Sequence, residues 1–253
     1  MSLKPQELRR YSRQMMISEI GKEGQEKLKN VSVLVVGAGG LGCPVMQYLS
    51  AAGIGKLGIM DADKVDEANL HRQILYGSYD LGKLKSIIAK TRLAYQNPLV
   101  DYEVFNIKLQ SKNALEIIGR YDIIVDATDN FPSRYLINDA CVICGKPMVY
   151  GSIYKFEGQL SVFNYNGGPT YRCLYPEIPE KHEAPEPSEI GVIGVLPGLI
   201  GTLQAIEVIK MAIGKGKIVS GELLIVNILY PSMYTIRIRK NEKNLSITEM
   251  ENP

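Results

Sequence analysis

The chain has 253 residues and a formal net charge of +2, and its composition is 45% hydrophobic and 22% charged. That length can bury one sizeable hydrophobic core, and the composition is that of an ordinary globular protein. Basic residues are scattered among acidic ones, which argues against the basic stripe of a nucleic-acid-binding surface. We therefore expect one enlarged domain without a nucleic-acid partner.

Three features predict the compartment. The N-terminal sequence MSLKPQELRRYSRQ lacks the apolar core of a signal peptide, and four cysteines in so long a chain do not suggest a disulfide framework. The longest uncharged run, residues 190–206, contains four glycines and Pro197, which make a poor lipid-spanning helix. We expect a cytoplasmic protein that does not bind a membrane.

In chain order, the first predicted elements are helices over residues 6–20 and 23–28, an N-terminal arm that carries the sequence RYSRQ. Five apolar residues among the six at 31–36 then predict a strand buried on both faces, and a helical pattern begins near Leu41. Between them Gly37, Gly39 and Gly42 form G-x-G-x-x-G. Bare backbone N–H groups and a helix N-terminus hold phosphate in such a turn, so the motif predicts a nucleotide site.

A second short strand at residues 57–60 ends at Asp61, nineteen residues after Gly42. An acidic side chain there can bond ribose hydroxyls, which favours a ribose without a 2′-phosphate. The glycine motif alone equally permits a nicotinamide or flavin dinucleotide. The polar, irregular stretch that follows, residues 61–77, predicts a surface loop with a functional role.

The remaining pattern alternates helices and strands and then changes. A parallel sheet with ligands at the carboxyl ends of its strands follows from the alternation, and strands separated by short turns after residue 157 predict an antiparallel continuation. The expected fold class is α/β, a Rossmann-like, mainly parallel sheet with helices on both faces. The predicted elements are helix 80–95, strand 102–107, helix 111–121 capped by Ser111, strand 122–130, helix 131–144, strand 147–150, strands within 158–168 and 221–240, a mobile loop at 177–189 and helix 199–213.

Several motifs then follow one another in a fixed order: GAGGLG, DADKV with NLHRQ, GKLK and DATDN, all within residues 37–130. With RYSRQ, EGQLSVF and GVIGVLPGLIG, they resemble the adenylating domain of the ubiquitin-activating superfamily. Within it the chain is most similar to the ThiF and MoeB type of sulfur-carrier activators, over residues 10–239. The resemblance implies that a small ubiquitin-like carrier protein with a C-terminal Gly-Gly attacks the α-phosphate of ATP, giving an acyl adenylate and pyrophosphate.

The resemblance also implies residue roles. Arg72 and Lys85 supply charge to the triphosphate, Asp129 holds Mg²⁺ beside it, and Arg13 reaches the nucleotide of a second subunit, which implies a homodimer. The nucleotide-binding set is Gly37, Gly39, Gly40, Gly42, Asp61, Asn69, Gln73, Lys85, Asp129 and Asn130, with Asp63 and Asp126 as weaker candidates. A C-terminal carboxylate, with a pKa of about 3.3 to 3.7, is already ionised and needs no general base.

The same resemblance divides the single domain into an arm at 1–30, a nucleotide-binding part at 31–150 and a carrier-binding part at 151–253.

The sequence departs from the family pattern at two places. Relatives hold a structural zinc with two Cys-x-x-Cys pairs, but here only Cys173 of the first pair is present, so no four-thiolate site can be built. Pro187 stands where some members have a loop cysteine, which excludes a thioester or sulfur transfer at that position and implies a separate sulfur donor.

Other residues receive structural interpretations. Cys141 and Cys144 fall inside a predicted helix without a second pair, so we interpret them as a buried structural pair. His71 and His182 lie in polar loops without metal-ligand spacing and are expected to be surface residues.

Two other functions stay open at this point. The glycine motif alone permits a Rossmann-type NAD-dependent oxidoreductase, although the loop histidines offer no candidate acid for hydride transfer and NLHRQ and DATDN would have no role. The chain could also be a partner-binding subunit that has lost catalysis, as one half of some heterodimeric activators has. The joint presence of Arg72, Lys85 and Asp129 argues against that second alternative.

Overall fold

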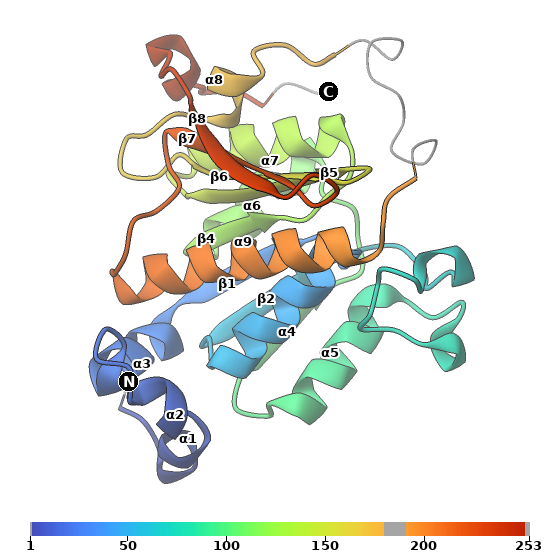
Figure 1. Ribbon diagram of the computed structural model, residues 1–253, viewed down its shortest axis with the longest axis vertical. Coiled ribbons are helices and arrows are strands. Elements are labelled where there is room, and N and C mark those ends of the chain that lie inside the picture. The colour runs from blue at the N-terminus through green and yellow to red at the C-terminus, as the bar shows by residue number, and fades with distance from the viewer. Residues whose placement is uncertain (1, 180–190, 251–253) are drawn as a thin grey trace.

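The computed structural model describes residues 2–179 and 191–250. In that part of the chain, eight strands form one sheet in the order β3-β2-β1-β4-β5-β6-β7-β8, with helices on both faces (Figure 1). Neighbours from β3 to β5 are parallel and those from β5 to β8 are antiparallel, which confirms the predicted fold class. The strands are β1 Ser32–Val36, β2 Lys56–Met60, β3 Asp101–Phe105, β4 Ile123–Asp126, β5 Met148–Tyr154, β6 Glu157–Phe163, β7 Glu222–Asn227 and β8 Ser232–Arg237.

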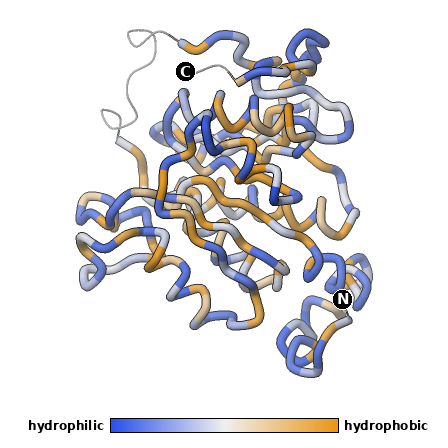
Figure 2. Tube along the Cα trace, turned by 180° about the vertical axis from the view of Figure 1, so that it is seen from behind, coloured by the Kyte–Doolittle hydropathy of each residue, from blue (hydrophilic) through white to orange (hydrophobic). Residues whose placement is uncertain are grey.

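The helices cover the sheet in two layers. Because strand side chains alternate, Val33 and Val35 join a core beneath α3, α4, α5 and α9, whereas Leu34 and Val36 join a second core beneath α6, α7 and α8. Hydrophobic residues accordingly gather in the middle of the molecule (Figure 2). The described helices are α1 Pro5–Arg10, α2 Ser12–Met15, α3 Gly21–Asn30, α4 Gly42–Ala52, α5 Lys85–Gln96, α6 Ser111–Gly119, α7 Phe131–Ile143, α8 Tyr171–Leu174 and α9 Val195–Ile213.

Some predicted boundaries are wrong. Helix α5 begins at Lys85 because the chain first makes a 3₁₀ turn, Ser78–Asp80, and then turns at Gly82, whose φ of 77° suits glycine. Ser111 does not cap α6: the cap is Gln110, whose backbone N–H donates to the Asn113 side chain. The single helix expected at residues 6–20 is instead α1 and α2, and α9 starts four residues before residue 199. Most of the predicted mobile loop 177–189, with Pro187 and His182, lies outside the described residues.

The N-terminal arm docks at the C-terminal end of α4. Tyr11 is buried, and its hydroxyl accepts a hydrogen bond from the Asn97 amide at 2.9 Å. The Gln14 amide donates to the carbonyl of Ala52, the last residue of α4, at 3.1 Å. Arg13, between these anchors, is exposed. The arm therefore lies at the opposite end of α4 from the glycine turn that precedes this helix (Figure 1).

Helix α9 is, by length and composition, the one helix in the described part of the chain that could cross a membrane. Half of its apolar window is buried inside the molecule, and it packs against α4, β5 and β6. Its Gln204 amide donates to the carbonyls of Asp126 and Val149, at 2.8 and 3.2 Å. The apolar side chains of α9 thus cover the sheet beside the C-terminal end of β4 and the N-terminal end of β5.

A hydrogen-bonded cluster joins the start of α8 to the C-terminal segment. The Cys173 sulfur accepts backbone N–H bonds from Thr170 and Asn241, both at 3.4 Å. The Thr170 hydroxyl donates to the carbonyl of Asn244 at 3.2 Å, and the Asn244 amide donates to the carbonyl of Arg172 at 2.8 Å. These are the two segments in which the family resemblance implies cysteine pairs, and direct hydrogen bonds connect them here.

We expect the purified protein to contain no stoichiometric zinc and to keep its melting temperature in a chelator. Only Cys173 of the four thiolates is present, and the connection it makes does not require a metal. Metal analysis with thermal unfolding, with and without chelator, measures both. One zinc per chain, with loss of the fold on chelation, would contradict this expectation.

Candidate functional site

One cavity of about 900 Å³ opens at the carboxyl ends of the parallel strands, between β1 and β4, where the strand order changes direction. This is the place where doubly wound sheets bind ligands. All predicted nucleotide residues except Gly42 and the weaker candidate Asp126 line it, together with Arg72. Its lining includes Gly37, Gly39, Gly40, Asp61, Asp63, Asn69, Arg72, Gln73, Lys85, Ala127, Thr128, Asp129, Asn130, Phe131, Ser133, Arg134, Ser152, Tyr154, Lys155 and Val192.

The glycine turn is closed by tight backbone packing. Gly37 has a φ of 100°, and a Cβ added to it would lie 2.5 Å from the Ala127 carbonyl oxygen. A Cβ on Gly42 would overlap the Gly37 carbonyl, so Gly42 lets the turn fold against α4 and does not itself line the cavity. The Tyr76 hydroxyl donates to the Ala38 carbonyl at 2.7 Å. The turn therefore presents backbone, not side chains, to a ligand.

Asp61 follows β2 and is fixed at the cavity wall. Its two carboxylate oxygens accept backbone N–H bonds from Ala38 and Asp63, each at 2.7 Å. Burial raises the pKa of the Asp61 carboxyl, while those two bonds act in the opposite direction. The carboxylate thus ties the glycine turn to the following loop and faces the same cavity.

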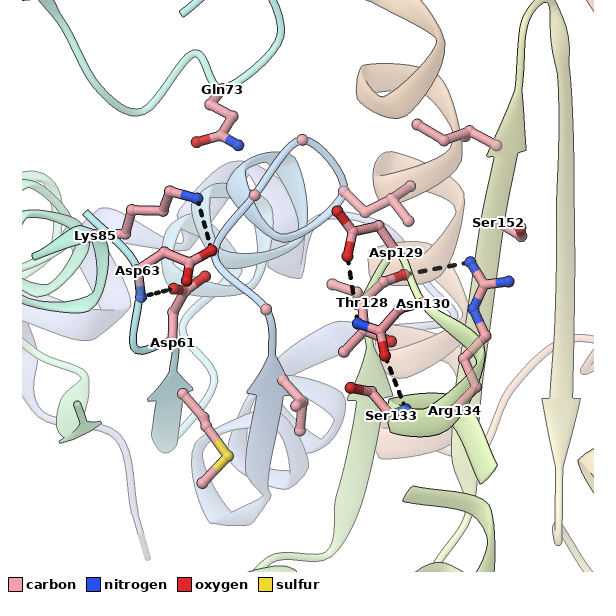
Figure 3. A pocket seen from close by; sticks show the side chains of 18 of the residues that line it. Asp61, Asp63, Gln73, Lys85, Thr128, Asp129, Asn130, Ser133, Arg134 and Ser152 are labelled. Carbon is pink, nitrogen blue, oxygen red and sulfur yellow. Dashed lines mark hydrogen bonds and ion pairs between the residues drawn. The ribbon is translucent and has the colours of Figure 1, made fainter. Parts of the chain in front are cut away.

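Two cations lie on this side of the cavity. Lys85, the first residue of α5, is 5% exposed, and its Nζ lies 3.3 Å from a carboxylate oxygen of Asp63 (Figure 3). The Arg72 guanidinium donates to the Asn69 side-chain oxygen at 2.7 Å. Nearby Gln73 is buried, and its Oε1 has no hydrogen-bond partner among the described residues. The two cations fit an anionic ligand such as a nucleotide, and the free Oε1 of Gln73 can accept a hydrogen bond from a donor group of such a ligand.

The opposite wall comes from the loop after β4 and the start of α7. The Asn130 side chain caps α7 by accepting the Ser133 N–H at 3.0 Å. Asp129 is exposed, and the Asn130 amide donates to it at 3.4 Å. Among the described residues no group of three His, Cys, Asp or Glu side chains could hold a metal ion. Asp129 would therefore hold Mg²⁺ only together with oxygens of a bound phosphate, as magnesium sites often do.

Several lining residues were not predicted. Ser133, Arg134, Ser152, Tyr154 and Lys155 lie outside the quoted motifs, and Val192 belongs to GVIGVLPGLIG but was given no role in the site. They come from α7, from β5 and its hairpin turn, and from the segment before α9. A signal existed for Arg134. In the predicted helix 131–144 it shares the inward face with Ile137 and Cys141, at i, i+3 and i+7, where a charge is unexpected.

The structure also places the residues that were given structural interpretations. Cys141 is buried in α7, Cys144 is half-buried at the end of that helix, and neither forms a disulfide. Burial raises the pKa of the Cys141 thiol well above its usual range. His71 is exposed, as expected. Arg13 does not line the cavity of its own chain.

Comparison with known proteins shows the family. A model of the ThiF family matches residues 11–247. The sulfur carrier protein adenylyltransferase of Thermus thermophilus is 49% identical over 243 residues, covering 94% of this chain and 90% of that protein. The adenylyltransferase and sulfurtransferase MOCS3 of Xenopus laevis is 49% identical over 230 residues, covering 91% of this chain and 51% of that protein. This chain thus spans about half the length of the frog protein.

The fold also recurs in a solved structure. The crystal structure of E. coli MccB with ATP superimposes on this chain with a TM-score of 0.81 at 22% identity. The match covers 92% of this chain and 72% of that chain. At this identity the likeness shows a shared fold.

Proposed function

This chain belongs to the ThiF family and is an ATP-dependent adenylyltransferase, and we propose that it adenylates the C-terminal glycine carboxylate of a small ubiquitin-like sulfur-carrier protein. The observation that carries the proposal is the 49% identity to a sulfur carrier protein adenylyltransferase over nearly the full length of both chains. The cavity supports it, because glycine backbone, two cations and Asp129 surround one space. The glycine motif was the reason to consider an NAD-dependent oxidoreductase, and family membership accounts for that motif without NAD. A subunit that had lost catalysis could also have lost Arg72 and Lys85, but both cations line the cavity.

In the proposed reaction, a carboxylate oxygen of the carrier attacks the α-phosphorus of ATP. The bond between that phosphorus and the oxygen bridging to the β-phosphate breaks, and pyrophosphate leaves with the electron pair. No proton has to be removed, because the carboxylate is ionised near neutral pH. The site must therefore supply positioning and positive charge where negative charge accumulates, and not a general base.

The described residues divide this task. Lys85 and Arg72 provide positive charge for the phosphates. The turn at residues 37–40 provides backbone N–H groups, and Asn69 and Gln73 orient the phosphates. Asp61, at the end of β2, binds the ribose hydroxyls. Lys85 is buried and already oriented by Asp63, so its charge needs little reorganisation when a phosphate enters.

Magnesium belongs to the same proposal. The exposed carboxylate of Asp129, beside Asn130, would hold Mg²⁺ jointly with the phosphates. Bound there, the ion would neutralise charge on the phosphates and on the pyrophosphate leaving group. Sulfur delivery to the activated carrier is assigned to a separate donor, because Pro187 cannot act as a nucleophile.

Pyrophosphate exchange into ATP tests the proposal. We expect exchange that depends on ATP, Mg²⁺ and a carrier with an intact C-terminal glycine, and none with a carrier that lacks this glycine. Each candidate carrier is added in turn, and binding of NAD is measured in parallel. Binding of NAD without binding of ATP would overturn the proposal.

A further inference from the structure

Arg134 occupies an unusual position for a charged residue. It lies in the first turns of α7, lines the cavity and is only 7% exposed. The centre of its guanidinium lies 5.5 Å from the centroid of the Tyr150 ring and 5.6 Å from that of Phe131. These aromatic contacts orient the guanidinium and exclude water from it. Burial of a cation is costly unless an anion accompanies it.

Within the described chain, the Arg134 cation is poorly matched. Its Nη2 donates to the Thr128 carbonyl over a long 3.4 Å, its Nε has no partner, and no carboxylate lies at ion-pair distance. Asp126 is a buried acid whose charge acts on Arg134, and one of its oxygens accepts from the N–H and hydroxyl of Thr128. Burial raises the pKa of the Asp126 carboxyl, whereas the charge of Arg134 and the bonds from Thr128 act in the opposite direction. Because no carboxylate of the described chain forms an ion pair with it, the Arg134 guanidinium can bind an anionic ligand.

Arg134 lies on the wall of the cavity that also carries Asp129, opposite Lys85, which is assigned to the phosphates. Figure 3 shows Lys85, Asp63 and Gln73 on one side, and Thr128, Arg134 and Ser152 on the other. The walls next to Arg134 come from β5, through Ser152 and Tyr154, and from Lys155 in the turn to β6. Ser152, Tyr154 and Lys155 lie in residues 151–253, the part predicted to bind the carrier, which holds none of the predicted nucleotide residues. The anion on this side is therefore expected to come from the second substrate.

We propose that Arg134 binds the C-terminal carboxylate of the carrier protein and aims it at the α-phosphate. This inference rests on the proposed function and adds a substrate-binding residue to it. A planar guanidinium can present two parallel N–H donors to a carboxylate, and the Arg134 side chain lines the cavity while making one long hydrogen bond within the described chain. Neutralising the carboxylate also lowers its repulsion from the phosphate oxygens that it must approach.

The experiment measures binding of the carrier to enzyme loaded with an α,β-methylene analogue of ATP, which cannot transfer adenylate. The carrier is used in two forms, with a C-terminal carboxylate and with a C-terminal amide. For the wild type, we expect the amide to bind about ten- to a hundredfold more weakly, the range for a charged hydrogen bond. For Arg134→Gln we expect the two forms to bind within about threefold of each other. Affinity for the ATP analogue should be unchanged.

Arg120→Gln is the matched control, because it removes an arginine whose ion pair with Glu103 lies outside the cavity. It should keep the full preference for the carboxylate form. If Arg134→Gln does not fold, Arg134→Lys keeps the charge, loses the forked geometry and should show a reduced preference. Equal binding of both carrier forms to the wild type would overturn the inference without any variant.

Three further outcomes separate this inference from its premise. If Arg134→Gln binds the ATP analogue much more weakly and keeps its preference for the carboxylate, Arg134 serves a phosphate and the inference is wrong. If the wild type exchanges pyrophosphate with a carrier but Arg134→Gln keeps the wild-type preference, only the inference fails. If no carrier supports exchange by the wild type, the proposed function fails.

Discussion

Replacing Lys85, Arg72 or Asp129 by alanine is expected to lower carrier-dependent pyrophosphate exchange by about a hundredfold or more in each case. Such losses are typical when one preorganised charge is removed from a site that stabilises developing negative charge. Lys85 should show the largest effect, because it is buried and held at 3.3 Å from Asp63 before any ligand binds. Initial exchange rates at saturating ATP and carrier measure the loss.

Two controls make this result interpretable. Asp63→Asn keeps the shape of the Lys85 partner but removes its charge, so it should cost far less than Lys85→Ala. Arg120→Ala removes an exposed ion pair with Glu103, outside the cavity, and should retain exchange near the wild-type rate. Near-normal exchange in all three cavity variants would show that this cavity is not where the adenylate forms.

Mixing two inactive variants, Arg13→Ala and Arg72→Ala, is expected to restore up to about a quarter of wild-type activity. Arg13 cannot reach the cavity of its own chain in this fold. Its neighbour Gln14 bonds to Ala52 at the C-terminal end of α4, whereas the glycine turn lies before the N-terminus of that helix. Eleven helical residues place the two ends about 16 Å apart. An exposed arginine in such an arm is suited to reach the cavity of the second subunit in a two-fold dimer.

The expected fraction follows from random exchange. Half of the chains pair as heterodimers, and each heterodimer has one site with both Arg72 of its own chain and Arg13 of the other. The rescue is measurable because an arginine that reaches phosphate charge from another subunit can change rates by orders of magnitude. Mixing Lys85→Ala with Arg72→Ala is the control, since both residues serve the same chain and no site is restored. If subunits exchange and activity does not return, the prediction that two subunits share each site is wrong.

The nucleotide half of the cavity was predictable because its residues follow strand ends in short motifs. The glycine turn, Asp61 and the DATDN loop each come directly after β1, β2 or β4, and parallel strands bring their carboxyl ends to one edge. Lys85 was found only through the family resemblance, because a single lysine at a helix start has no local signature. Its burial and its contact with Asp63 depend on the packing of α5 against the sheet.

The other half of the cavity was not predicted. Arg134, Ser152 and Lys155 come from α7, β5 and a hairpin turn. Only Arg134, a charge on the inward face of a predicted helix, left a signal in the sequence. Only the pairing of β4 with β5, followed by the return of β6, brings them beside Asp129. The predicted start of α5 was wrong for a related reason. The 3₁₀ turn before this helix depends on hydrogen bonds and on the left-handed conformation of Gly82, which hydrophobic periodicity does not reveal.

Mass spectrometry of the carrier protein after incubation with enzyme, ATP and Mg²⁺ tests the central claim most directly. We predict a carrier that has gained one AMP moiety at its C-terminal glycine, together with release of pyrophosphate. The same carrier with a C-terminal amide should remain unmodified. An unmodified carboxylate carrier, or release of ADP and phosphate in place of pyrophosphate, would contradict adenylation of a protein C-terminus at this cavity.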